Sequence, residues 1–411
     1  MPYSGIFFHA AASSTASLLV YFLNLPAVAL QGLHTYIHPD SLLASDGTKA
    51  LLRRPGAAAS ALSEPKRRPR SKDAQPSFDE SKAQLFRIRL TDSLLPSRLF
   101  FSSYRSAFLS SFVALSNLVL CLFLLLPGSF TAVVIPIAAV LISAAQLLVF
   151  LLKLSLERSA SRHSDRRLSL LSAAIGFLFS IFVLNLSPSV INFRIPTFVT
   201  PIAAAFAGFL SGILFIPAGR SARAFWLGTD QLRWNLSVVS CGTIGRVMLY
   251  LAAILNFFSS LMWVNPLAIG ERFEECRVWA LTAAAISQLL VLRSNVQMYL
   301  NEAVLCWYQR LHSSRVPDMD YGRAKVFLHN HFVCLAVIQF FAPPLLVLLF
   351  AGLSQIRGNL FEGIPFIGGL TDFSVVVKEM ALFMAWWIMS VHSALMMLMI
   401  AFYRCGFAFV S

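Results

Sequence analysis

Long apolar stretches separated by shorter polar gaps run along almost the whole chain. Nine of them reach about 20 residues, the length that a helix needs to cross the hydrocarbon core of a bilayer. They cover residues 5–30, 107–126, 131–152, 169–186, 198–217, 246–265, 277–295, 327–352 and 380–403. The apolar residues are continuous rather than alternating, which excludes spanning β-strands. The pattern therefore predicts an all-α polytopic transmembrane bundle of nine helices, or of eight if the first stretch is lost or the short seventh does not cross.

Composition supports a membrane protein. Hydrophobic residues make up 57% of the chain and charged residues only 13%, against roughly 25% charged residues in a soluble domain. Of the 33 lysines and arginines, 28 fall in alternate gaps and 5 in the others. Because positive residues stay on the cytoplasmic side, this alternation predicts an outside or luminal N-terminus and a cytoplasmic C-terminus, in a membrane that the sequence does not identify. It also explains the net charge of +14 without nucleic acid.

The chain divides into three parts. Residues 1–33 are expected to hold the first helix, 34–105 a basic and largely disordered cytoplasmic loop, and 106–411 the other eight helices. The first stretch could also be a signal peptide, but no charged residue precedes Asp40. A missing basic segment at the start favours a helix that is retained.

The densest basic cluster lies within the first loop. It contains Lys66, Arg67, Arg68, Arg70 and Lys72. One interpretation is a contact with anionic lipid of the cytoplasmic leaflet, at about 1 kcal/mol per basic residue near the surface. The alternatives are a solvated loop that only fixes the topology, which we favour, and a nuclear address, which fits poorly with nine spans.

The seventh stretch has an arginine near each end. Only 15 residues separate Arg277 from Arg293, about 23 Å of helix against about 30 Å of hydrocarbon, so at least one of them must approach the lipid or snorkel. Arg293, Gln297 and Asn301 recur every four residues and form a polar stripe on one helix face. The stripe fits a polar cavity, an ion path or a lock between helices. It also fits a snorkelling arginine followed by an ordinary amphipathic helix.

Two other patterns concern how the helices pack. Ala204, Gly208 and Gly212 form a ladder of small residues that allows another helix to approach closely, within the chain rather than in a dimer. Pro343 and Pro344 lie in the middle of the eighth stretch, where two missing N–H donors predict a kink. The kink could be purely structural, which we favour, or it could serve as a hinge or cation site.

Signals for catalysis are absent from the sequence. It contains no glycine loop for phosphate, no zinc-type spacing and no nucleophile elbow. His392 lies near the middle of the last stretch with no acidic residue nearby in sequence, as a packed neutral histidine would. We therefore expect no cofactor, no metal and no enzymatic activity.

The second half of the chain resembles a known family. The most specific element is the run Arg293-Ser294-Asn295-Val296-Gln297-Met298-Tyr299-Leu300-Asn301. Four further elements follow the same order, namely Pro217-Ala218-Gly219-Arg220, Leu261-Met262-Trp263-Val264-Asn265-Pro266, Phe341-Ala342-Pro343 and Ala385-Trp386-Trp387. Over residues 206–403 these elements are similar to the transmembrane protein 161 family, whereas the first 100 residues match it poorly.

The resemblance implies a multi-pass membrane protein, linked in some members to stress tolerance or membrane excitability, and it supplies no catalytic or transport residue. Because the polar stripe coincides with the family-like run, we expect the stripe to make a specific contact. The leading functional interpretation is a non-enzymatic scaffold or regulator of other membrane proteins. The alternative is a channel or transporter whose cytoplasmic vestibule the stripe lines, and a membrane enzyme is the third.

Overall fold

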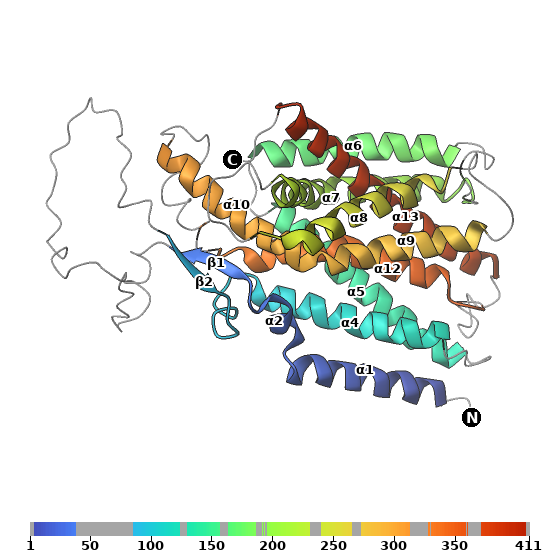
Figure 1. Ribbon diagram of the computed structural model, residues 1–411. Coiled ribbons are helices and arrows are strands. Elements are labelled where there is room, and N and C mark those ends of the chain that lie inside the picture. Colours follow the sequence, from blue (N-terminus) through green and yellow to red (C-terminus); the bar gives the residue numbers. More distant parts are fainter. Residues whose placement is uncertain are drawn as a thin grey trace, which may run out of the picture.

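The computed structural model describes residues 4–37, 85–123, 130–156, 163–185, 191, 193, 195–230, 240–264, 273–312, 328, 330–358, 360 and 371–407. Roughly parallel and antiparallel helices form one elongated bundle (Figure 1). The helices are α1 (Ser4–Phe22), α2 (Leu25–Leu30), α4 (Phe101–Phe123), α5 (Phe130–Leu156), α6 (His163–Asn185), α7 (Thr200–Thr229), α8 (Gly242–Leu261), α9 (Phe273–Leu290), α10 (Leu292–His312), α12 (Val333–Ser354) and α13 (Thr371–Arg404). The strands are β1 (His34–Ile37) and β2 (Phe86–Arg89).

The predicted fold class is confirmed. Eight of the described helices are long and apolar enough to cross a membrane, and the bent pair of α9 and α10 gives a ninth if it is one span. The first expected span is shorter than predicted, because α1 ends at Phe22 and α2 follows separately. Asn24, between them, adopts a left-handed conformation with φ of 44°, which asparagine tolerates better than most residues.

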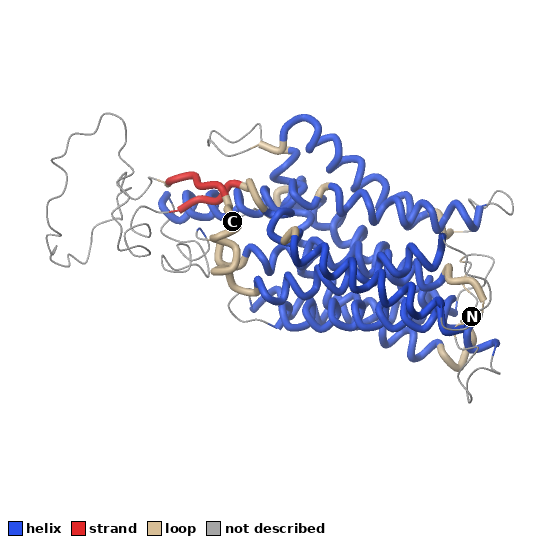
Figure 2. Tube along the Cα trace, turned by 90° about the horizontal axis from the view of Figure 1, so that it is seen from below, coloured by secondary structure: helices blue, strands red, loops and turns tan. Residues whose placement is uncertain are grey.

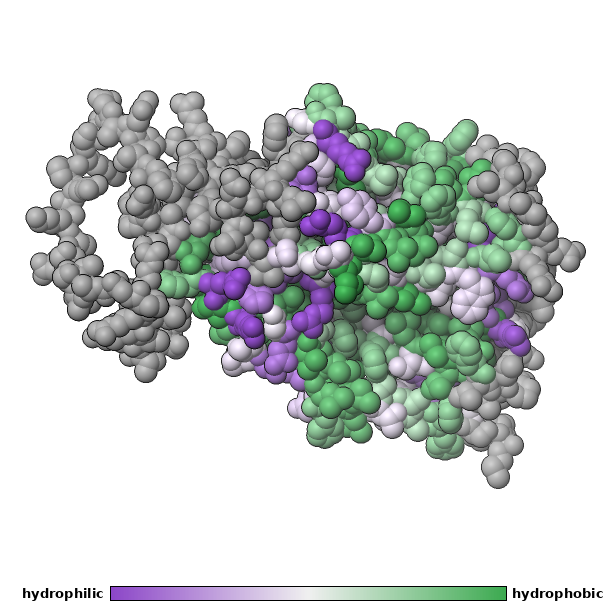
Figure 3. All heavy atoms as spheres, in the orientation of Figure 1, coloured by the Kyte–Doolittle hydropathy of each residue, from purple (hydrophilic) through white to green (hydrophobic). Residues whose placement is uncertain are grey.

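Helix α12 forms the centre of the bundle. Its sequence carries no charged residue and only two strongly polar positions, Gln339 and Ser354. A helix that is apolar on every side can be surrounded by other helices, and α12 contacts α4, α5, α7, α9, α10 and α13. Its spanning window is 94% buried, against 17% for α6 and 22% for α1 at the periphery. In the space-filling view the face over the helices is mostly hydrophobic, as a lipid-facing surface must be (Figure 3).

The two strands project from one end of the bundle. They pair antiparallel, with His34 opposite Arg89 and Ile37 opposite Phe86, and they lie beside α10 (Figure 1). We call this end, which carries β1, β2 and α10, the hairpin end. The start of α1 lies at the opposite end, whereas α13 finishes at the hairpin end (Figures 1 and 2).

This hairpin corrects one expectation for the first loop. Residues 40–91 show no strand periodicity convincing enough to predict, yet Phe86–Arg89 form β2 and pair with β1. Four residues per strand are too few for a clear alternating pattern. The partner strand lies 49 residues earlier in the chain, so no local turn signal connects the two.

Candidate functional site: the hairpin dock of α10

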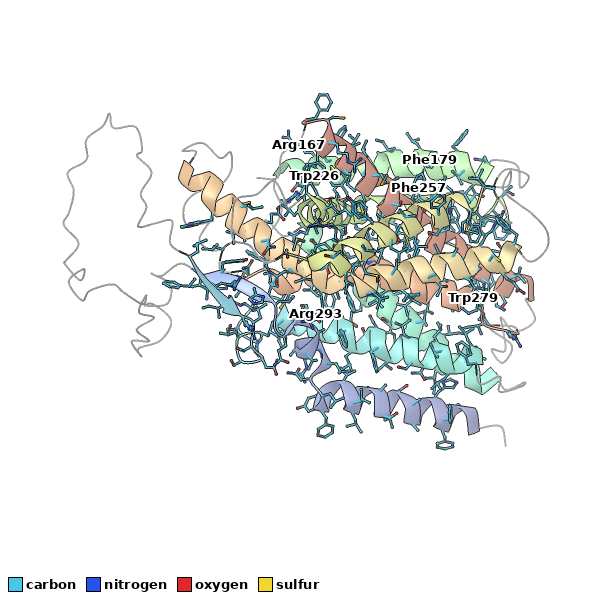
Figure 4. The ribbon with its side chains drawn as sticks, viewed as in Figure 1. Arg167, Phe179, Trp226, Phe257, Trp279 and Arg293 are labelled. Carbon is cyan, nitrogen blue, oxygen red and sulfur yellow. The ribbon has the colours of Figure 1, made fainter. Side chains whose placement is uncertain are left out.

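A break interrupts the helix of the short seventh apolar stretch. Helix α9 ends at Leu290 and α10 begins at Leu292, with a bend of 46° between them. The 18 residues of α9 extend about 27 Å, close to the hydrocarbon thickness. The bend therefore gives α9 nearly the length of a span by itself, and α10, with Arg293 near its start, runs on toward the hairpin end (Figure 4).

Arg277, at the other end of α9, lies inside the protein and not in the lipid. Only 2% of its surface is exposed. Its guanidinium carbon lies 4.8 Å from the ring centroid of Phe273 and 5.7 Å from that of Trp263. Aromatic faces attract a desolvated guanidinium, so these rings hold the charge within the bundle. The expected approach of an arginine to the lipid does not occur at Arg277.

The polar stripe of α10 holds the hairpin. Gln297 accepts a hydrogen bond from the His34 N–H at 2.9 Å, and its Nε2 donates to the His34 carbonyl at 3.1 Å. The Tyr36 hydroxyl donates to Asn301 Oδ1 at 3.3 Å, and Arg293 donates to a backbone carbonyl just before β1, that of Gln31, at 2.9 Å. We call these six residues, three on α10 and three on the segment 31–36, the hairpin dock. The structure thus brings all three predicted stripe residues together.

Gln297 acts on β1 as a neighbouring strand would. A strand edge presents unpaired N–H and C=O groups that need partners. The amide of Gln297 supplies one acceptor and one donor, and it satisfies both backbone groups of His34. The same amide also donates to Asn301 at 3.2 Å. Because Gln297 is only 6% exposed and Asn301 only 2%, these bonds are formed away from solvent, where unpaired groups would be costly.

Two further contacts complete the attachment of β1. Asn330, just before α12, donates to Thr35 Oγ1 at 2.7 Å. Tyr36 packs with Trp307, Val304 and Leu328 in a small buried apolar cluster. The hairpin is therefore fixed both by polar contacts with the stripe and by apolar contacts with the later part of α10.

A different face of α10 attaches to α7 through charged residues. Arg223 forms a salt bridge with Glu302 at 3.1 Å, and the Glu302 side chain is 6% exposed. One turn earlier, the Arg220 guanidinium carbon lies 5.0 Å from the ring centroid of Tyr299. Helix α10 thus links the hairpin on one face to the bundle on another.

The electrostatics of the dock favour a neutral histidine. Burial lowers the pKa of His34 below its ordinary value of 6.5, and the positive charges of Arg87 and Arg89 lower it further. Arg89 lies directly opposite His34 in the hairpin. The imidazole therefore resists protonation while β1 and β2 are paired.

The predicted ladder of small residues faces α6. A Cβ atom added at Gly208 would lie 2.8 Å from Phe177 Cβ, and one added at Gly212 would lie 2.9 Å from Ala173 Cβ. Ser180 of α6 also donates to the Ala204 carbonyl at 3.3 Å. All three ladder residues therefore belong to a close contact within the chain, between α6 and α7.

The structure leaves the predictions for the prolines and the basic cluster untested. Helix α12 runs without a break through Pro343 and Pro344, both of which are buried, so the kink and the cation site remain predictions. The candidate lipid contacts at residues 66–72 lie outside the described residues. In the part of the chain that the structure describes, no cluster of histidine, cysteine and acidic side chains is suited to a metal ion.

Sequence reasoning missed the hairpin side of the dock. Gln31, His34 and Tyr36 of the dock, and Asn330 beside it, lie in segments that show no strong pattern. The one available signal is the alternation in Phe86-Arg87-Ile88-Arg89, together with the β-prone run Thr35-Tyr36-Ile37. Neither run indicates that β1 also contacts a helix about 260 residues later in the chain.

The tryptophans of the family-like pair connect α13 to two other helices. Trp387 donates to the Ala207 carbonyl of α7 at 2.9 Å, and Trp386 donates to the Ser260 carbonyl of α8 at 3.0 Å.

No protein-family model matches the chain. No solved structure matches it either.

Proposed function

We propose that this chain is a non-enzymatic membrane scaffold or regulator that acts on other membrane proteins, and that it belongs to the transmembrane protein 161 family. The observation that carries the proposal is that the polar stripe binds the hairpin. A vestibule needs polar side chains that face water, but Gln297 and Asn301 are buried against the hairpin. The residues that most resemble the family hold one part of the protein to another.

The hairpin end also offers a surface for a partner. Arg87 and Arg89 of β2 and Arg293 of α10 are exposed, and hydrophilic side chains gather near this end in the space-filling view (Figure 3). A rigid basic surface beside the membrane suits the acidic part of another membrane protein or anionic lipid headgroups. The basic cluster at residues 66–72 would add to the same charge.

We place the hairpin end in the cytoplasm and the start of α1 outside or in a lumen. Two features support this orientation. The chain enters and leaves the bundle at opposite ends (Figures 1 and 2), as an odd number of crossings requires. The gaps that hold 28 of the 33 basic residues lead to the hairpin end, and positive residues mark the cytoplasmic side.

A channel or transporter is the second candidate. One observation favours it, namely a small cavity deep in the bundle that is lined by Asn256 and His392. Polar residues within membrane helices often mark transport paths. The stripe would then position the helices around the path without lining it.

Flux measurements on the reconstituted full chain separate the two candidates. We expect liposomes that contain the protein to pass ions and small solutes no faster than protein-free liposomes. Flux that depends on the protein and disappears in Arg293→Ala would overturn the scaffold proposal. Flux that survives in Arg293→Ala but is lost in His392→Phe would favour the second candidate.

Photo-crosslinking in cells tests whether the hairpin end binds another membrane protein. A photoreactive residue at Arg87, which is exposed on β2, should capture a defined membrane protein repeatedly. The same residue at Trp279, which is 66% exposed on α9 near the other end of the bundle (Figure 4), should capture lipid instead. Capture at Arg87 should be lost in Gln297→Leu, where the hairpin is released. Equal capture with and without that substitution would contradict a role for the dock.

A further inference from the structure

A small cavity lies beside the break between α9 and α10. Its volume is about 30 Å³, and α7, α8, α9, α10, α12 and α13 contribute to its walls. Its polar lining consists of Ser221, Asn256, Gln288, Asn295 and His392. None of the lining residues is acidic or carries a lysine or arginine side chain. The other seven of the twelve lining residues are apolar, so the cavity has a mixed and uncharged lining.

Two buried polar atoms on its walls lack a protein partner. His392 is 4% exposed and Asn256 is 3% exposed. Neither His392 Nδ1 nor Asn256 Oδ1 has a hydrogen-bond partner among the protein atoms that the structure describes. Buried polar groups in proteins almost always have a partner, and within a membrane the cost of leaving them unpaired is high. Both residues line the same cavity, so one occupant could serve both side chains.

The hydrogen-bonding roles of the two unpaired atoms fit a water molecule. His392 Nε2 lies 3.3 Å from Ser221 Oγ, so a proton on Nε2 would be donated to Ser221 and Nδ1 would be left as an acceptor. Asn256 Oδ1 is also an acceptor. One water molecule has two O–H donors and can satisfy both atoms. If Nδ1 carries the proton instead, the same water accepts from it and still donates to Asn256.

We infer that this cavity is a hydration site in which water bridges Asn256 of α8 to His392 of α13. A water molecule needs roughly 10–15 Å³ measured in the same way, so the cavity holds one or two. The neutral lining offers no carboxylate to a divalent cation and no positive side chain to an anion. Cavities that stay dry are lined by apolar residues alone, whereas five of the twelve residues that line this one are polar.

The site lies deep within the bundle. His392 is 12 residues before the end of α13, about 18 Å along the helix axis from the hairpin end. The bridging water connects helices that enter the bundle from opposite ends. This inference concerns hydration alone, so it holds for a scaffold as well as for a channel.

Solid-state NMR on the full chain in lipid bilayers tests the inference directly. With ¹⁵N-labelled histidine, the transfer of magnetisation from water protons to each ring nitrogen reports a water in contact with it. The His392 signal is assigned by its loss in His392→Gln. His9 is a matched internal control, because it is 2% exposed and its Nδ1 already bonds Asn117 Oδ1 at 3.0 Å. We expect transfer from water to build up several-fold faster at His392 Nδ1 than at His9 Nδ1.

Equally slow build-up at the two histidines in the unmodified protein would overturn the inference, and this comparison needs no substitution that could impair folding. The variant Asn256→Leu then tests the bridge. It removes one of the two partners and places an apolar side chain in the cavity, so the His392 build-up should fall toward that of His9. An unchanged His392 signal in a folded Asn256→Leu protein would contradict the bridge.

Discussion

Two interfaces of this protein hold neighbouring elements together by opposite means. Helices α6 and α7 approach closely because Gly208 and Gly212 lack side chains, so that Cβ atoms there would collide with α6. The hairpin dock joins α10 to β1 through polar side chains that reach across to backbone groups. One interface depends on side chains that are missing and the other on side chains that are present.

The difference reflects where each interface lies. Lipid is as apolar as leucine, so burying apolar surface between helices gains little there, and close packing has to stabilise the contact. The dock lies at the end of the bundle beside an unpaired strand edge, where backbone groups need partners. We therefore expect steric substitutions to disrupt the first interface and loss of a single amide to disrupt the second.

The largest effect is expected at the glycine interface. A side chain at Gly208 would meet Phe177 Cβ at 2.8 Å and the Ala173 carbonyl at 3.1 Å, and neither can move far. Gly208→Val should lower the free energy of unfolding by about 3 kcal/mol, the upper part of the usual range for overpacking. Unfolding in mixed micelles with increasing SDS would measure the loss.

Gly219 provides the control on the same helix. A Cβ atom added there meets nothing within 4 Å, so Gly219→Ala should be neutral or slightly stabilising, because alanine favours helices. If Gly208→Val and Gly219→Ala were equally stable, the close approach of α6 and α7 would not be what holds them together.

At the dock, a smaller and more local effect is expected. Gln297→Leu keeps the approximate volume but leaves both backbone groups of His34 without their partner, at a local cost of about 2 kcal/mol. Hydrogen exchange at the amides of residues 34–37 should accelerate, while exchange in α6 and α7 stays unchanged. Gln355→Leu is the matched control, since Gln355 is exposed and its side chain bonds its neighbour Ser354. Unaltered exchange in β1 would argue against the dock.

The smallest effect concerns pH. Because burial and then Arg87 and Arg89 lower the pKa of His34, the docked hairpin binds fewer protons than the released one. The contribution of neutral His34 is fully present above the ordinary pKa of 6.5 and is lost as pH falls through the lowered value. Solvent screening should keep this contribution to the stability of the docked hairpin below about 1 kcal/mol.

Hydrogen exchange of β1 between pH 7.5 and pH 5, compared at each pH with His34→Gln, would isolate this contribution. The difference between the two proteins should shrink as the pH falls. Arg89→Gln removes one of the two nearby charges and should move the transition toward higher pH. A transition that does not move would mean that Arg89 has no influence on His34.

The bundle could be predicted from the sequence because apolar length is a local property. The stretches at 107–126 and 131–152, for example, correspond to α4 and α5 with shifted ends. The ends shift because residues too polar to count toward an apolar stretch can still continue the same helix. Helix α13 begins at Thr371, nine residues before the predicted start.

The dock could be predicted only in part. The four-residue spacing of Arg293, Gln297 and Asn301 places them on one face of a helix, but it does not identify what that face contacts. The partner strand is short and distant in sequence, and its identity depends on tertiary structure. The break at Val291 was also hidden, because neither proline nor glycine marks it.

The pairing of β1 with β2 has a consequence for the long stretch of chain between them. Ile37 and Phe86 are directly opposite each other, so the two ends of this stretch are held side by side. For a flexible loop whose ends are held in this way, doubling the length costs only about 0.6 kcal/mol of closure entropy. The hairpin thus separates the size of this insertion from the stability of the bundle, and residues could be added or removed there while the membrane helices keep their arrangement.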